Sequence, residues 1–357
     1  MAAVAVALPR ALSRLCHRRC PALPRPAWTG GHRGHRGNSG TATAGRPRWA
    51  RPAGAALAFL GGFFSLFPRD AEEDGEEAIV MLLKRAKLSI MKGELPEAEQ
   101  LLHQALRQAH QQENRQAIIY AYSMMGNVAY MQGQLDNAEK LYKATMSYML
   151  AGDTKEDDNA VLEVSLKLAS IYAAQKQHKL AVAGYQFCIL TLEEKIAKQK
   201  DLPEDVLSAE EKANTQLLLG MSLDSYGRYL LNINELPAAQ KMYEKALKIS
   251  NDVQGETHPQ SVVLLNDLAT VLDAQGCYEE ALAYSRRAAE LARDTQHPEE
   301  HMVLNNLAAI LMHKDFLQAK QVYKEALKQA QQKGDAASVQ HIQEELAELA
   351  KRRKGSK

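Results

Sequence analysis

Six copies of one short pattern are the feature of this chain that most limits how it can fold. In each copy, an alanine is followed four residues later by a tyrosine, leucine or serine, and then after three more by a small residue. The copies are Ala98/Leu102/Ala105, Ala138/Tyr142/Thr145, Ala181/Tyr185/Cys188, Ala239/Tyr243/Ala246, Ala281/Ser285/Ala288 and Ala319/Tyr323/Ala326. Spacings of three and four place side chains on one face of a helix.

A second small residue precedes each copy by 11 or 12 positions. These residues are Ala86, Gly126, Ala169, Gly227, Ala269 and Ala308. A small side chain lets two helices approach closely, whereas any side chain larger than alanine would hold them apart. The two patterns together predict six pairs of antiparallel helices.

This arrangement resembles the tetratricopeptide repeat, a helix-turn-helix unit that stacks on its neighbours because no unit can bury its apolar face alone. The resemblance implies an all-α fold, a right-handed α-solenoid of about six helix pairs. The expected repeats cover residues 79–334, divided as 79–112, 119–152, 162–200, 220–254, 262–294 and 301–334. A final helix over 335–351 would cap the solenoid, and a basic tail over 352–357 would follow it.

The repeats are longer than the usual tetratricopeptide period of about 34 residues. The stretch from Gly255 to Pro259 begins the fifth unit and resembles the repeats of kinesin light chains. A wider gap lies between the third and fourth units, where Ser208 and Glu211 have the spacing of a capping box at a new helix start. An extended second helix in the third unit, followed by an ordered linker, is the simplest interpretation.

The N-terminal part has a different composition from the rest of the chain. Residues 1–69 contain 11 arginines and no lysine, aspartate or glutamate, whereas the remainder has 33 basic against 43 acidic residues. An arginine-rich, acid-free start is typical of a mitochondrial transit peptide, which we assign to residues 1–51 and expect to be disordered. A disordered basic tail that binds RNA or acidic lipid is the alternative.

Residues 52–68 form an uncharged run of 17 residues, mostly apolar. A membrane-spanning helix needs about 20 apolar residues, or about 17 at the short end, so the run is a candidate inner-membrane segment. Residues 69–78 would form an acidic linker. If the segment is retained, the positive-inside bias places the repeats in the intermembrane space. Cleavage after the segment, or full import with peripheral attachment, would leave them in the matrix.

No motif for catalysis or cofactor binding is present in the sequence. There is no glycine-rich phosphate loop and no Gly-x-Ser-x-Gly turn, and the four cysteines lack the spacing of metal ligands. His297 and His301 are four residues apart, but Pro298 lies between them and indicates a helix start rather than a zinc site. We therefore predict a protein that is not an enzyme and needs no cofactor, metal, nucleic acid or small-molecule substrate.

Binding of a peptide in the groove of the solenoid is the function that the fold favours. The first helices of successive repeats line the concave surface, and asparagine suits such a groove because its amide bonds both peptide N–H and C=O groups. The candidate groove residues are Lys87, Asn127, Arg228, Asn266, Asn305 and Asn306.

Particular stretches resemble a family of mitochondrial tetratricopeptide repeat proteins. They are residues 82–91, 166–174, 274–276 and 339–349. The resemblance implies an inner-membrane factor that binds respiratory complex III and supports its assembly or maintenance, including clearance of fragments of the Rieske iron-sulfur subunit. The alternative is a motor-cargo or chaperone adaptor that binds peptides in the groove; the N-terminus lacks the sustained heptads that motor binding would need.

Overall fold

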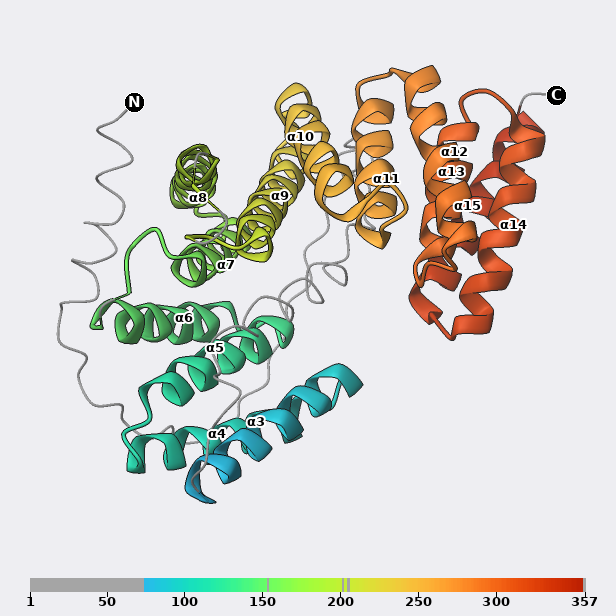
Figure 1. The fold of residues 1–357 in the computed structure, drawn as a ribbon. Coiled ribbons are helices and arrows are strands. Elements are labelled where there is room, and N and C mark those ends of the chain that lie inside the picture. The colour runs from blue at the N-terminus through green and yellow to red at the C-terminus, as the bar shows by residue number, and fades with distance from the viewer. Residues whose placement is uncertain (1–73, 153, 201, 204–205, 356–357) are drawn as a thin grey trace. The chain divides into compact units, whose positions relative to one another are not determined.

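The described part of the chain is entirely helical. The computed structural model describes residues 74–152, 154–200, 202–203 and 206–355, and within these ranges it contains helices α3–α15 and no strand (Figure 1). The all-α repeat fold predicted from the sequence is therefore confirmed. The predicted transit peptide, 1–51, and membrane segment, 52–68, lie outside the described residues.

The chain forms two compact units, with the division after Glu156. The first contains α3 (Asp74–Lys92), α4 (Leu95–Gln111), α5 (Arg115–Met131) and α6 (Leu135–Leu150). The second contains α7 (Asn159–Ala174), α8 (His178–Gln199), α9 (Ala209–Asn232), α10 (Leu236–Gln254), α11 (Pro259–Ala274), α12 (Tyr278–Asp294), α13 (Glu300–Leu311), α14 (Phe316–Lys333) and α15 (Ala336–Gly355). In both units each odd-numbered helix up to α13 packs most extensively on the helix that follows it.

The tyrosines of the repeat pattern explain why small residues recur in the preceding helix. Tyr142 and Tyr243 are fully buried, and their rings lie against Gly126 and Gly227. A Cβ atom added at Gly126 would be 2.8 Å from the Tyr142 ring, and one at Gly227 would be 3.2 Å from the Tyr243 ring. The small residue therefore makes room for a ring that fills the space between the paired helices.

Local signals in the sequence account for several helix starts. Pro96 and Pro237 lie in the first turns of α4 and α10, where an absent N–H costs no helical hydrogen bond. Ser208 caps α9, because its Oγ accepts from the Glu211 N–H at 3.2 Å while the Glu211 carboxylate accepts from the Ser208 N–H at 3.0 Å. The predicted capping box is confirmed, and it starts a helix of 24 residues.

Three helix boundaries differ from the predicted segments. Helix α3 begins at Asp74, inside the expected acidic linker. Helix α13 begins at Glu300 rather than at Pro298, because His297 Nδ1 accepts from the Glu299 N–H at 3.1 Å and holds a turn before the helix. Helix α15 continues to Gly355, into the expected basic tail.

Across the residues that the structure describes, none of the helices combines the length and the apolar character that crossing a bilayer requires.

Candidate functional site on the inner helix faces

The first helices of successive pairs line one side of each unit. In the second unit α7 contacts α9, α9 contacts α11 and α11 contacts α13, whereas successive second helices make no comparable contact within the described residues. In the first unit α3 contacts α5 in the same way. Helices that approach one another define the inner side of a curved stack, so the candidate groove residues lie on the helices expected to form it.

Tyrosine hydroxyl groups reach this inner side from the core. Tyr142 donates a hydrogen bond to Asn127 Oδ1 at 2.5 Å, and Tyr185 donates one to Ser170 Oγ at 3.2 Å. Both acceptors lie 15 residues before their tyrosine, immediately after the small residue of the repeat. The hydroxyl group therefore fixes the orientation of the side chain at this position. Asn127 is buried, and its Oδ1 already accepts the hydrogen bond from Tyr142.

The corresponding position in the fourth repeat holds Arg228, which joins two helices. Its guanidinium lies 3.0 Å from the Asp224 carboxylate, one turn earlier on α9, and 3.5 Å from the Asp267 carboxylate on α11. The Arg228 side chain retains 27% of its exposure and that of Asp267 retains 20%. One cation and two carboxylates thus meet where the inner faces of α9 and α11 approach each other.

Two pKa values in this cluster are raised, each for a different reason. The neighbouring Asp224 carboxylate raises the pKa of Arg228, although burial opposes the shift. Burial raises the pKa of Asp267, and the Arg228 guanidinium only partly offsets this effect. The cluster has two acids for one base, so it could accept a further hydrogen-bond donor or a positive charge from a partner.

Three asparagines extend the polar surface to α13. Asn306 Nδ2 donates to Asn266 Oδ1 at 2.8 Å, which links α11 to α13. Asn305 is buried beside it, and its Oδ1 has no hydrogen-bond partner within the described residues. Two of the predicted groove amides therefore bind each other, while the third holds a buried acceptor with no hydrogen-bond partner among the described residues.

The remaining predicted groove residues belong to the first unit. Lys87 is half-buried on α3, and burial lowers the pKa of its ammonium group. Asn127 lies on α5 of the same unit. The structure thus brings Asn266 and Asn306 into contact and groups Arg228 with their neighbour Asp267. Lys87 and Asn127 are not placed relative to them.

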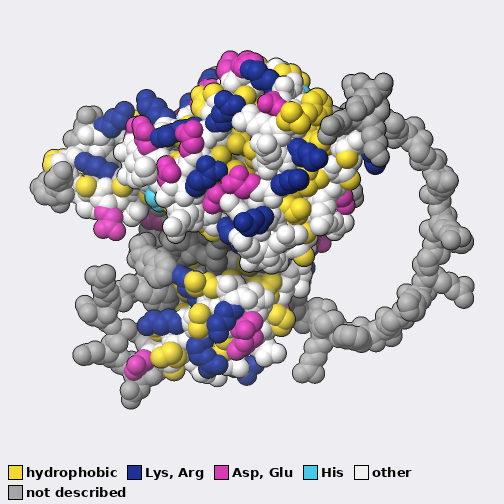
Figure 2. All heavy atoms as spheres, turned by 90° about the vertical axis from the view of Figure 1, so that its right-hand side faces the viewer, with side chains coloured by type: hydrophobic (Ala, Val, Ile, Leu, Met, Phe, Trp, Pro, Cys, Tyr) yellow, Lys and Arg dark blue, Asp and Glu magenta, His cyan; other side chains and the backbone are white. Residues whose placement is uncertain are grey.

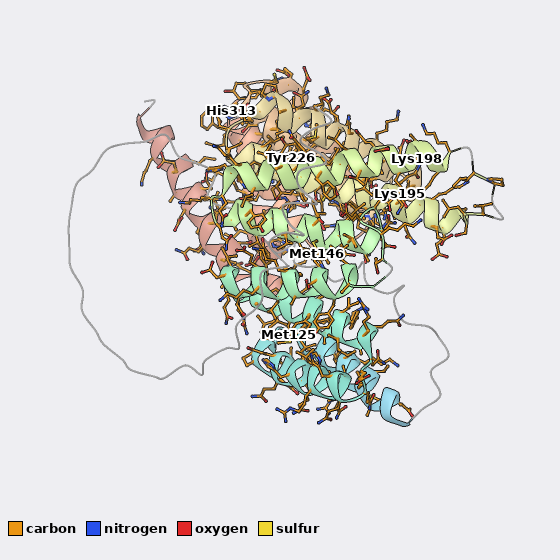
Figure 3. All side chains as sticks on the ribbon, turned by 90° about the vertical axis from the view of Figure 1, so that its left-hand side faces the viewer. Met125, Met146, Lys195, Lys198, Tyr226 and His313 are labelled. Atoms are coloured by element: carbon orange, nitrogen blue, oxygen red, sulfur yellow. The ribbon has the colours of Figure 1, made fainter. Side chains whose placement is uncertain are left out.

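Aromatic side chains pack next to the Arg228 position. Tyr226, labelled in Figure 3, stacks on Tyr185 of α8 with ring centroids 5.3 Å apart. Tyr229 lies beside both rings, and its hydroxyl group is 2.9 Å from His178 Nδ1. These contacts join α8 to α9 and give the helix that positions Arg228 a rigid support.

Asp224 and Asp267 were not predicted as part of the groove. Asp224 precedes Arg228 by four residues, a spacing that pairs opposite charges on one helix face, and this signal was available in the sequence. Asp267 had no such signal, because it reaches Arg228 only through the packing of α9 against α11.

The two histidines that resemble a zinc motif have other partners. His297 Nδ1 accepts from the backbone of Glu299, and His301 Nε2 lies 3.3 Å from Asp335 Oδ2 on α15. In the described ranges, no cluster of three or more histidine, cysteine or acidic side chains is arranged to hold a metal ion.

Comparisons with known proteins agree with this architecture. Residues 222–294 and 263–332 match a family model described as tetratricopeptide repeat. The protein of Homo sapiens named "Tetratricopeptide repeat protein 19, mitochondrial" is 58% identical over 305 residues, which cover 85% of this chain and 80% of that protein. Its homolog in Drosophila melanogaster is 25% identical over 311 residues, 87% of this chain and 80% of that protein.

A comparison with solved structures gave several matches. One is the crystal structure of BtubC (BKLC) from P. vanneervenii, which is 15% identical to this chain. It aligns over 80% of this chain and 94% of that one, with a TM-score of 0.47.

Proposed function

Because the chain belongs to the family of mitochondrial tetratricopeptide repeat protein 19, we propose that it is a non-catalytic scaffold of the mitochondrial inner membrane. In this proposal the repeats bind respiratory complex III and support its assembly or maintenance. Two observations support it: close relatives are named mitochondrial, and each described unit is built of packed helix pairs with polar side chains on the first helices. Repeat proteins of this kind generally act as binding scaffolds rather than as catalysts.

The groove assignment rests on the polar surface shared by α9, α11 and α13. Arg228 and Asp267 keep part of their exposure there, and the buried Asn305 Oδ1 lacks a partner among the described residues. An extended peptide offers backbone N–H groups to such acceptors. The Asn266–Asn306 contact serves a different purpose, because it holds the two helices at a fixed spacing.

Clearance of Rieske subunit fragments would follow from binding alone. A scaffold that holds a released fragment presents it to a protease elsewhere, so no residue of this chain needs to break a bond. If the purified protein, free of co-purifying protease, degraded such a fragment, this part of the proposal would be wrong.

The test is capture from mitochondria with a tagged full-length protein in mild detergent, followed by native gels and mass spectrometry. We expect complex III subunits, including the Rieske protein, to co-migrate with the wild-type chain. Asn305→Ala should reduce their recovery, because it removes the unpaired acceptor from the inner face. No hydrogen bond within the described residues is broken, but truncation of this buried side chain leaves a cavity, so thermal unfolding of the variant is compared with that of the wild type.

Ser285→Ala is the matched control for this variant. Ser285 is fully buried on α12, a second helix, and its hydroxyl group also lacks a partner within the described residues, so the change should leave recovery unaltered. Equal loss from both variants would indicate a folding effect. Capture of motor or chaperone subunits in place of complex III would favour the adaptor alternative.

A further inference from the structure

One face of α3 exposes large apolar side chains. Met81, Leu88 and Met91 retain 52%, 51% and 66% of their exposure. Their separations of seven and three residues place them on one side of the helix. The opposite side, which includes Ile79 and Leu83, is buried in the core of the first unit.

This exposed face is unusual for the end of a helical repeat stack. The first helix has no preceding repeat to cover it in the described structure, and terminal helices normally present a polar outer surface. Helix α15, the last helix of the second unit, follows that rule: its exposed residues with described side chains include Gln343, Glu344 and Glu348 and no large apolar residue. The exposed apolar residues of α3 therefore indicate a binding surface.

Basic side chains share the face with the apolar ones. Lys84, Arg85 and Lys92 are exposed at positions adjacent to Leu88 and Met91. Glu77 is the only acidic residue among the α3 side chains that the structure describes. In Figure 2 the lower part of the molecule shows apolar, basic and acidic side chains next to one another.

We propose that this face of α3 lies on an anionic lipid surface. Met81, Leu88 and Met91 would enter the boundary between head groups and acyl chains, while the three bases extend to lipid phosphate groups. Amphipathic helices rich in lysine and arginine bind membranes by this combination of apolar burial and charge attraction. Long basic side chains can keep their charged ends in the head-group region while their stems lie on apolar surface.

The neighbouring sequence also favours a membrane as the occupant. The uncharged run 52–68 ends only five residues before Asp74. Five extended residues span at most about 18 Å, so a run that enters the bilayer would hold α3 at its surface. The proposal concerns a different surface from the groove and does not depend on what the groove binds.

A second copy of the chain is a poorer fit to this face. A two-fold interface would bring each patch against its own copy, and Lys84, Arg85 and Lys92 would then approach the same three bases of the partner. Like charges at short range are unfavourable, whereas anionic lipid neutralises all three.

The test uses the full-length chain with a photoreactive amino acid at position 88, mixed with phosphatidylcholine vesicles that contain or lack phosphatidylserine. We expect lipid adducts at position 88 with the anionic vesicles and few with the neutral ones. The same probe at Gln104, which is exposed on α4, should give few adducts with either. Each basic residue near an anionic surface contributes attraction equivalent to about a fivefold change in affinity.

Charge reversal on α3 tests whether lipid binding depends on this surface or only on the net charge of the protein. Lys84→Glu/Arg85→Glu/Lys92→Glu should reduce adduct formation at position 88 by about a hundredfold or more. The control, Lys248→Glu/Lys324→Glu/Lys328→Glu, makes the same change in net charge at exposed positions of α10 and α14 and should have little effect. Circular dichroism would show that both variants fold.

Three results would overturn the proposal. One is equal adduct yield at positions 88 and 104, which would indicate contact through another part of the chain. Another is equal loss from the two charge-reversal variants. The third is cross-linking of position 88 to a second copy of the chain, or to an acidic protein in mitochondrial extract, in preference to lipid.

Discussion

Gly126 and Gly227 occupy the same repeat position but leave different amounts of space. Alanine in a helix interior is favoured over glycine by about 0.5–1 kcal/mol, yet a Cβ at Gly126 would approach the Tyr142 ring to 2.8 Å. Overpacking of this kind costs about 1–3 kcal/mol. We expect Gly126→Ala to lower the free energy of unfolding by about 1–2 kcal/mol in urea titrations.

Two other glycines provide graded controls for this substitution. A Cβ at Gly227 would lie 3.2 Å from the Tyr243 ring, and one at Gly220 would lie 3.4 Å from Ile249 Cγ2. Gly227→Ala should therefore cost less than Gly126→Ala, and Gly220→Ala should be neutral or stabilising. The ring-packing account would be wrong if the three substitutions had the same effect.

The hydroxyl group of Tyr142 offers a second test at the residue scale. Tyr142→Phe would leave the buried Asn127 Oδ1 without the donor that now lies 2.5 Å away. An unsatisfied buried acceptor costs about 1–3 kcal/mol, so thermal unfolding should shift to lower temperature. Tyr323→Phe is the matched control, because its hydroxyl group lies 3.4 Å from the half-exposed Glu345, which water can solvate. A larger loss from the control would contradict the prediction.

At the scale of the element, Asp335 makes the start of α15 dependent on pH. The Ser338 hydroxyl group donates to its carboxylate at 2.6 Å, and this bond, together with the Ser338 N–H and His301, lowers the pKa of Asp335 to about 2. A carboxyl whose pKa is lower in the folded state stabilises the fold above its unfolded pKa of about 4. That stabilisation is lost as the pH falls toward 2.

The measurement for Asp335 is urea unfolding at several pH values between about 5 and about 2. Asp335→Asn keeps an acceptor suited to helix capping but cannot titrate, so its stability should fall less steeply than that of the wild type over this range. Parallel pH curves for the two proteins would show that Asp335 does not contribute to acid sensitivity.

At the scale of the molecule, the two units should respond separately to local damage. Each helix pair contacts only its neighbours, so stability is a sum of local terms. We expect Gly126→Ala to raise hydrogen exchange in α5 and α6 while leaving α11 and α12 as protected as in the wild type. Mass spectrometry of exchanged peptides would measure this. Uniform deprotection of both units would instead indicate a single cooperative transition.

The sequence by itself determined the fold class, the helix pairs and the positions that must be small. These properties depend on residues close together in the chain: the spacing from Ala138 to Tyr142, the proline in the first turn of α4, and the capping box at Ser208. Such patterns act through the geometry of a single helix or turn, and this geometry is the same in every protein.

The tertiary structure decided which side chains of the candidate site contact one another. Asn266 and Asn306 were both predicted to face a ligand, but they bind each other across α11 and α13. Asp267 joined the site only because α9 packs on α11. Met81 is part of an exposed face because α4 and α5 pack on the opposite side of α3. Side chains 39 or 40 residues apart in the chain meet through helix packing, and a repeat pattern specifies that helices stack without specifying which polar atoms will then be in contact.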